Sequence, residues 1–292
     1  MATGSVMLRA ITRDGSAFIH VCDSTALVAK ASGIHHPSKT MTAVLGRALT
    51  GCSLMGALLK GQNNSLTLQI KGDGPAGSIV CVSDSRGNVR GYADYPQVEL
   101  PPNALGKLDV GGAVGQGNLH IIKDLGMNEP YVGLCPLVSG EIAEDITEYY
   151  AKSEQIPSVC ALGVRVNRDL TVKAAGGLLL QLLPGADEGV ITQIEQNLPA
   201  LGSVSARLAE GQTPEDLINL LFAGIPYDIL DRIPVDYQCH CRREKYLSIL
   251  ASLNQKDKQE LIDRGEDIET VCQFCGKTYR FTVQELENTN RR

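Results

Sequence analysis

The 292-residue sequence has no tryptophan and only four phenylalanines, so few large aromatic side chains are available to anchor a core. No apolar run of about eighteen residues occurs, and no membrane span is therefore expected. The opening segment, MATGSVMLRAITRDG, lacks the charged-then-apolar layout of a signal peptide. Positive charge is also scarce, with 27 Lys and Arg against 33 Asp and Glu, which argues against general nucleic-acid binding.

Two segments resemble nucleotide-binding motifs, but the residues around them do not fit such a site. Residues 71–77 contain G-x-G-x-x-G, but Pro75 lies inside the motif, and an alternating segment follows where a dinucleotide site needs a helix. A hairpin turn is predicted there instead. Residues 276–278 resemble the end of a phosphate-binding loop, but the position of its first glycine is Val271. No metal-protease helix or carboxylate pair stands out, so the sequence predicts that the protein is not an enzyme.

The cysteines do not form a secreted disulfide framework. Their number, nine, is odd, and their distribution suits a protein of the reducing cytosol, where we expect this chain to work. Five of them stand alone, mostly between apolar residues, and are expected to pack as small core side chains. These five are Cys22, Cys52, Cys81, Cys135 and Cys160.

The other four cysteines form a C-x-C pair and a C-x-x-C pair near the C-terminus. They are Cys239, Cys241, Cys272 and Cys275. Two thiol pairs on either side of a short insert predict one zinc ion held by four thiolates. Gly276 follows the second pair, at a turn that needs a residue tolerant of unusual backbone angles. His240 could replace one cysteine, although four thiolates already complete a tetrahedral site.

The residues alone leave two interpretations of this zinc site open. In the first, zinc only holds the fold, and its binding supplies on the order of 10–16 kcal/mol to a segment too small to fold comfortably alone. In the second, oxidation of the thiolates removes that stabilisation, and the site is a redox switch. Disulfides could then form at the C-x-x-C pair and, with more strain and easier reduction, at the C-x-C pair.

Apolar patterning predicts an α+β core over residues 1–183, in which short strands joined by glycine turns form an antiparallel sheet with helices between them. A hairpin is expected around Asp14 and Gly15, and Ser38 is expected to cap a long helix. The predicted strands are 5–12, 17–22, 65–71, 77–83, 88–93, 117–123, 131–137, 161–167 and 170–183, and the predicted helices are 38–60 and 140–153.

A helical linker is predicted over residues 184–235. Its part 187–223 has the pattern of short amphipathic helices, one of them capped by Thr213. Pro226 and Pro234 are expected to break regular structure after these helices. We hypothesise that the apolar faces of the helices cover the sheet of the core; the alternative is that they are a permanent part of that core.

The last part, residues 236–292, is predicted to be a small zinc-binding domain. Between the two cysteine pairs lies a helical pattern, and residues 278–283 alternate as a strand. Lysine and arginine nearly balance aspartate and glutamate here, which speaks against a zinc-ribbon adaptor for nucleic acids. A thiol-disulfide oxidoreductase that uses the C-x-x-C pair is a further alternative, and it would turn over disulfides without holding a tight metal.

At these residues the chain resembles a known family, the redox-regulated thirty-three-kilodalton heat shock proteins of bacteria. The C-x-C and C-x-x-C-G arrangement is the hallmark of that family, and the resemblance extends through the chain. Other segments that resemble the family are KGDGP at 71–75, VGQGNL at 114–119, SEQIPS at 153–158 and AAGGLLLQLLPG at 174–185.

The resemblance implies an ATP-independent holdase chaperone that acts in the stress response and is inactive while reduced and zinc-bound. By the same resemblance, oxidation joins Cys239 to Cys241 and Cys272 to Cys275, and zinc is released. The zinc domain and the linker then unfold, and apolar surface becomes available to unfolding client proteins. The resemblance also implies that the activated form is a homodimer, and it implies neither nucleic acid nor membrane as a partner.

Overall fold

The structure is a computed structural model that describes residues 4–289. The chain divides into two compact units, Met1–Gln238 and Cys239–Arg292, which are described separately. The finer division of the chain at residues 183 and 235 stays a prediction. No helix in the described part of the chain is long and apolar enough to cross a membrane.

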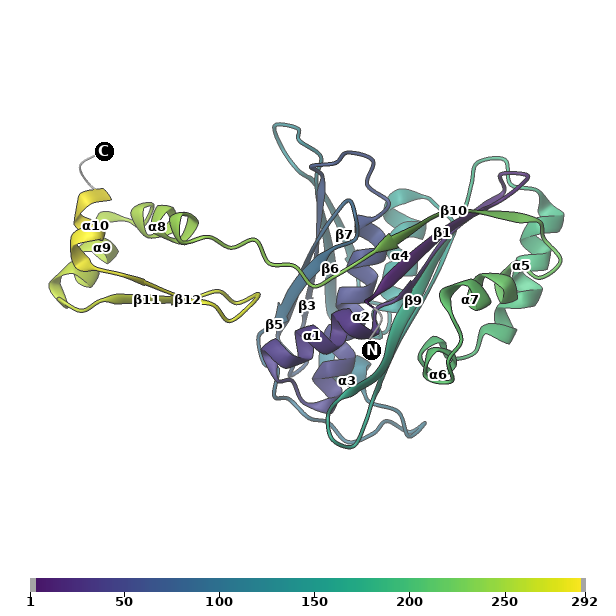
Figure 1. The fold of residues 1–292 in the computed structure, drawn as a ribbon, viewed down its shortest axis with the longest axis horizontal. Helices are drawn as coiled ribbons and strands as arrows, with labels where there is room; N and C mark the ends of the chain where they lie inside the picture. Colours follow the sequence, from purple (N-terminus) through teal and green to yellow (C-terminus); the bar gives the residue numbers. More distant parts are fainter. Residues whose placement is uncertain (1–3, 290–292) are drawn as a thin grey trace. The chain divides into compact units, whose positions relative to one another are not determined.

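Antiparallel strands and helices build the first unit, which confirms the predicted α+β class (Figure 1). Its strands are β1 (Val6–Thr12), β2 (Ala17–Asp23), β3 (Ser65–Gly72), β4 (Ser78–Asp84), β5 (Val89–Ala93), β6 (Gly117–Asp124), β7 (Tyr131–Pro136), β8 (Ser158–Val166), β9 (Val172–Leu182) and β10 (Tyr227–Pro234). Its helices are α1 (Thr25–His35), α2 (Lys39–Gly56), α3 (Val110–Val114), α4 (Ala143–Tyr149), the π-helical turn η1 (Tyr150–Glu154), α5 (Glu188–Leu201), α6 (Val204–Ala209) and α7 (Pro214–Leu221).

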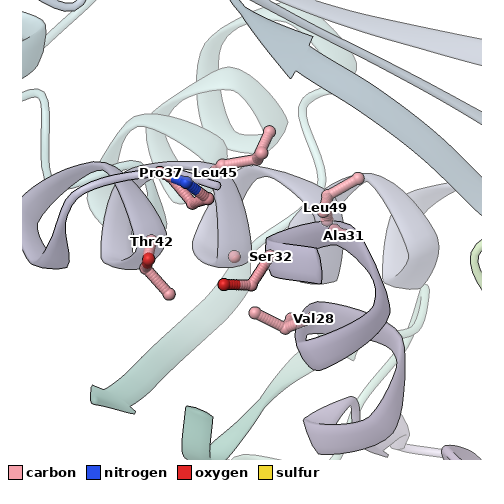
Figure 2. Close-up of a pocket in the computed structure, with 8 residues that line it drawn as sticks. Val28, Ala31, Ser32, Pro37, Thr42, Leu45 and Leu49 are labelled. Atoms are coloured by element: carbon pink, nitrogen blue, oxygen red, sulfur yellow. The ribbon is translucent and has the colours of Figure 1, made fainter. Parts of the chain in front are cut away.

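Two five-stranded sheets form in the described part of this unit, in the orders β10-β1-β2-β9-β8 and β5-β4-β3-β6-β7. Helix α2 packs between them and is buried on almost every side, because apolar and small residues surround its axis. The side chain of Ser38 accepts a hydrogen bond from the backbone N–H of Met41 at 3.1 Å, which confirms the predicted cap. Residues of α1 and α2, with Pro37 between the helices, line a small pocket (Figure 2).

Several local predictions are confirmed. Strands β1 and β2 pair across the turn at Asp14 and Gly15, where Gly15 has a φ of 76°. The glycine-rich segment 71–77 joins β3 to β4 as a hairpin turn, as predicted, and no dinucleotide-binding helix follows it. The five isolated cysteines are all buried.

Helices α5, α6 and α7 cover the face of the first sheet that points away from α2, as we hypothesised. A second core forms there between the sheet and the helices. The sheet contributes Leu8, Ala10, Ala17, Ile19, Val21, Leu178 and Leu180, and the helices contribute Ile194, Leu201, Val204, Leu217, Ile218 and Leu221. Thr213 caps α7 in a reciprocal capping box with Asp216, so this predicted helix start is also confirmed.

The expectation that Pro226 and Pro234 break regular structure is wrong for the residues between them. These residues form β10, which pairs antiparallel with β1 at the edge of the sheet. Proline is tolerated at the ends of an edge strand, because its missing N–H does not have to serve an inner ladder. The two prolines therefore bound a strand that the sequence analysis had placed in a helical linker.

The second unit contains α8 (Arg243–Ala251), α9 (Gln255–Asp263), β11 (Ile268–Val271), β12 (Thr278–Phe281) and α10 (Val283–Thr289). The predicted helical insert and the strand near 278–283 are present, and β11 pairs with β12 in a hairpin. The buried apolar core that the structure describes here is small. It consists of Leu250, Ile268, Tyr279, Phe281 and Leu286. A core of this size supplies little stability by itself.

Candidate metal centre

The two cysteine pairs come together in the second unit. Cys239 and Cys241 lie in the segment that leads into α8, and Cys272 and Cys275 lie in the turn between β11 and β12. All four Sγ atoms lie within 4.8 Å of one another. The Sγ atoms of Cys239 and Cys272 are 3.7 Å apart, and those of Cys241 and Cys275 are 3.4 Å apart.

The turn between β11 and β12 positions the second pair. The backbone N–H of Cys272 donates to the carbonyl of Lys277 at 2.9 Å, and the N–H of Gly276 donates to the carbonyl of Cys272 at 2.8 Å. Gly276 has a φ of 70°, in the left-handed region that other residues rarely adopt. The expected role of this glycine in the turn is therefore confirmed.

The spacing of the sulfur atoms fits a tetrahedral metal ion. Four thiolates around zinc, each about 2.3 Å from the ion, lie roughly 3.8 Å from one another. The Sγ distances of 3.4 Å, 3.7 Å and at most 4.8 Å agree with that arrangement. The cluster consists of the four thiols, and His240 is an exposed residue outside it. These residues can hold a metal ion, and the assignment of all four as zinc ligands stays a prediction.

Two tyrosine hydroxyls form hydrogen bonds to thiols of the cluster. The hydroxyl of Tyr279 lies 3.1 Å from both the Sγ and the carbonyl oxygen of Cys241. The hydroxyl of Tyr246 hydrogen-bonds to the thiol of Cys272. The two rings stack with their centroids 5.0 Å apart, so each ring holds the other in place.

The thiols of the cluster differ in acidity. Burial raises the pKa of Cys239 to about 12. Burial acts in the same direction on Cys272, but hydrogen bonds from the Tyr246 hydroxyl and the backbone N–H of Cys275 outweigh it, and they lower its pKa to about 7. Cys272 is therefore the first of these two thiols to ionise.

The five isolated thiols are of a different kind. Burial raises the pKa of Cys52 to about 12, and it raises the pKa values of Cys22, Cys81, Cys135 and Cys160 as well. A buried thiol that stays protonated is a poor nucleophile and a poor metal ligand. Their predicted role as core side chains is confirmed.

The sequence analysis missed both tyrosines. Tyr246 lies in α8, within the helical pattern predicted between the cysteine pairs, and Tyr279 lies in β12, within the strand predicted over 278–283. An aromatic residue with a polar tip, set on the inner face of an element next to a cysteine pair, is the signal that could have indicated a hydrogen bond to a thiolate.

The chain is therefore a two-unit protein, in which an α+β unit with two antiparallel sheets is followed by a small unit with four clustered thiols. Residues 5–282 match a family described as Hsp33 protein. The chain belongs to this family.

Curated relatives and a solved structure agree with this assignment. The chain is 45% identical over 282 residues to a 33 kDa chaperonin of Lachnoclostridium phytofermentans, with 97% of each chain covered. It is 43% identical over 285 residues to a 33 kDa chaperonin of Ruminiclostridium cellulolyticum, which covers 98% of this chain and 97% of the relative. The crystal structure of the 33 kDa chaperonin from Thermotoga maritima superposes with a TM-score of 0.91 at 36% identity, covering 99% of this chain and 98% of that one.

These comparisons confirm the resemblance found in the sequence and the overall architecture. The relatives are named as chaperonins and not as enzymes. Membership of a chaperone family implies that unfolded client proteins are the binding partners. What the four thiols do in this chain is a separate question.

Proposed function

We propose that this chain is a redox-regulated, ATP-independent holdase that binds unfolding proteins and prevents their aggregation under oxidative stress. One observation carries the proposal: four thiols that can hold a metal ion converge in a unit whose own apolar core is small. A fold that depends on oxidisable ligands responds to oxidants through its stability.

In the reduced state, Cys239, Cys241, Cys272 and Cys275 are the residues that would hold Zn²⁺ as thiolates. When bound, zinc supplies a structural cross-link between the start of α8 and the β11–β12 turn. The hydroxyls of Tyr246 and Tyr279 donate to two of the sulfur atoms and orient them. The unit stays compact, and the protein is inactive.

Oxidation changes the chemistry of the sulfur atoms. Each disulfide forms when two thiols lose two electrons and two protons to a peroxide, which is reduced to two waters. We carry over the pairing from the family resemblance, with Cys239 joined to Cys241 and Cys272 joined to Cys275. A sulfur atom in a disulfide no longer offers the thiolate that a metal ion requires, so the cross-link is lost.

Loss of the cross-link uncovers apolar surface. The small core of the second unit cannot maintain the fold alone, and unfolding then extends into the segment 184–235. Helices α5, α6 and α7 in this segment cover a contiguous apolar sheet face, which becomes available to non-native chains when they leave. The activated form is a homodimer and the protein works in the bacterial cytosol, with neither nucleic acid nor membrane as a partner.

The proposed function is tested with a client that aggregates on heating. Protein oxidised by peroxide at elevated temperature should suppress the aggregation in proportion to the amount of chaperone added, without ATP. The reduced, zinc-bound protein should have little effect. Catalytic turnover of disulfides, or a salt-dependent complex with RNA or DNA in place of aggregation suppression, would contradict the proposal.

A further inference from the structure

Strand β10 closes one edge of the first sheet, where β1 is its neighbour (Figure 1). The paired residues run from Val6–Pro234 to Thr12–Tyr227. Two further backbone bonds extend the pairing beyond both ends, from Arg13 to Pro226 at 2.9 Å and from Val235 to Ser5 at 3.1 Å. The backbone of β10 thus pairs with the outer edge of β1 along the whole length of β1.

Most side chains of β10 contribute little to its attachment, and the exceptions are Tyr227 and Ile233, which pack against the two cores of the first unit. None of its residues is buried, and Ile229 and Leu230 are 40% and 50% exposed. The register shifts between Arg9 and Ala10, which leaves Leu230 in a bulge without a partner in β1. Backbone hydrogen bonds, ion pairs at the rim and the packing of Tyr227 and Ile233 therefore hold β10 in place.

Two ion pairs of different geometry join β10 to β1 and to Arg13, the residue that follows β1. Arg9 makes two hydrogen bonds to Asp231, at 2.8 Å and 2.5 Å, and both side chains are partly buried. The pair between Arg13 and Asp228 is a single contact at 3.1 Å between well exposed side chains. Exposed pairs stabilise weakly, so the Arg9–Asp231 pair is the stronger of the two restraints.

Strand β1, in contrast, is apolar on both faces. Met7, Leu8 and Ala10 are fully buried, with Met7 in the core around α2 and with Leu8 and Ala10 in the core under α5–α7. A long apolar strand with an unpaired edge is a strong template for the addition of another strand. Once β10 leaves, β1 is such a strand.

The position of β10 in the sequence links it to the metal centre. Pro234 ends β10, and the first thiol of the cluster, Cys239, follows five residues later. Disorder that starts at the oxidised thiols reaches β10 before any other strand of the first unit. Between β10 and the thiols, the backbone of residues 236–238 pairs, within the described part of the chain, with Val89 alone, at the start of β5, so the edge of β1 is the first full strand edge that oxidation would free.

We propose that β1 is the docking strand for clients, and that an extended segment of an unfolding protein adds to it as an antiparallel strand in the place of β10. This inference rests on the proposed holdase function and names the surface and the mode of binding. Backbone hydrogen bonds give affinity without a sequence requirement, which suits partners of unrelated sequence. Alternate apolar side chains of the client pack on the sheet face that α5–α7 cover at rest.

A second edge offers a clear contrast. Strand β7 lies at the edge of the other sheet and exposes Tyr131, Val132 and Leu134 by 43%, 57% and 57%. This edge is already open while the thiols are reduced. Client binding at β7 would not depend on oxidation, whereas binding at β1 does.

The test uses the full-length protein and a fluorescent peptide with the β10 sequence, YDILDRIP. Its binding to reduced and to oxidised protein is followed by fluorescence anisotropy. Two control peptides carry the same side chains with N-methyl groups on alternate backbone amides, one peptide for each register. We expect the parent peptide to bind oxidised protein at least tenfold more tightly than reduced protein. One N-methylated register should bind at least tenfold more weakly than the other.

Two results would overturn the inference. Equal binding of both N-methylated peptides and the parent would mean that side chains, and not strand pairing, hold the peptide. Equal binding to reduced and oxidised protein would place the peptide at an open edge such as β7. Suppression of client aggregation by the same oxidised sample is measured in parallel, so a failure of the holdase function itself is seen separately from a failure of strand addition.

A pair of variants tests directly whether the Arg9–Asp231 ion pair keeps β10 attached to β1. Asp231→Asn removes the charge that Arg9 contacts twice, and Asp228→Asn removes the charge of the exposed pair as a matched control. Reduced Asp231→Asn protein should bind the peptide severalfold more tightly than reduced Asp228→Asn protein. Equal binding by the two reduced variants would contradict the assigned role of the Arg9–Asp231 pair.

Discussion

The hydroxyl of Tyr279 lies 3.1 Å from the Sγ of Cys241, although 38 residues separate the two in the sequence. The same hydroxyl lies 3.1 Å from the carbonyl oxygen of Cys241, and the ring stacks on Tyr246. A donor held so firmly orients the sulfur atom and lowers the electron density that it offers to an oxidant. Tyr279 is thus a positioning residue for the thiol cluster.

Tyr279→Phe should weaken metal binding by about 10-fold or more, because the ring and its stacking remain while the hydrogen bond to Cys241 is lost. Competition with a zinc-sensitive chelator measures the affinity, and the rate of thiol oxidation by peroxide should rise as well. Tyr95→Phe, at a side chain that is 61% exposed in the first unit, is the control. Identical zinc affinity in the two variants would show that the hydroxyl has no such role.

Cys272→Ser should release the metal, unfold the second unit and loosen residues 184–235, while the core over residues 1–183 stays folded. The lost thiol belongs to the proposed zinc site, whose metal would contribute on the order of 10 kcal/mol to a unit with a small core. Limited proteolysis should therefore cut residues 184–292 rapidly and leave a stable fragment of residues 1–183. Cys160→Ala, which lies outside the cluster, should keep its zinc. Cleavage of residues 1–183 as rapid as that of the C-terminal part in Cys272→Ser would contradict the independence of the core.

Tyr237 anchors the chain two residues before the first thiol. Its side chain is 2% exposed, and its hydroxyl donates to the carbonyl of Gly91 at 2.8 Å and lies 3.0 Å from Nε2 of His35. Tyr237→Phe should lower the free energy of unfolding of the first unit by about 1–3 kcal/mol, because buried partners lose a hydrogen bond. Urea denaturation measures this change.

The same Tyr237→Phe variant should be activated by peroxide at a lower temperature than the unmodified protein, since the segment between β10 and the thiols is held less firmly. Tyr95→Phe is again the matched control. Unchanged stability together with an unchanged activation temperature would mean that Tyr237 does not restrain this segment.

His20 makes the first unit sensitive to acid. Nδ1 lies 3.2 Å from the carbonyl oxygen of Leu54, which can only accept, so Nδ1 carries the proton of the neutral ring. Burial lowers the pKa of His20 from 6.5 to about 4. Between these values the unfolded chain binds a proton that the folded chain does not, so stability is fully present above pH 6.5 and falls as the pH drops toward 4.

The loss over this interval should amount to about 3 kcal/mol and should disappear in His20→Gln, which has no titrating ring. Urea denaturation at a series of pH values measures it, and His36→Asn, at an exposed histidine, serves as the control. The same pH dependence in His20→Gln as in the control would assign the acid sensitivity to other groups.

Much of the fold could be predicted from the sequence, because local signals determine it. Ser38 before a run of apolar residues indicates a capped helix, and Asp14 with Gly15 indicates a hairpin; the structure contains both. The four thiols were found because the chemistry of the metal fixes the spacing of its ligands within each pair. In these cases the residues that decide the structure are neighbours along the chain.

The missed features depend on partners far away in the sequence. Strand β10 has weak strand character of its own, and it forms because β1, more than 200 residues earlier, offers an unpaired edge. The hydrogen bond from Tyr279 to Cys241 likewise joins two elements that only the folded unit brings together. No local pattern around Pro226 indicates the pairing with β1, and near Tyr279 the sequence offers only an aromatic residue with a polar tip close to a cysteine pair.

The central claim is that the metal held by sulfur keeps the C-terminal unit compact, and that its loss uncovers a surface that binds clients. The most direct measurement is a peroxide titration of the reduced protein at elevated temperature, in which zinc release, helix content and client aggregation are followed in one sample. We predict that zinc appears in solution, helix content falls and aggregation is suppressed over the same range of oxidant. Release of zinc with client aggregation left unchanged would contradict the claim.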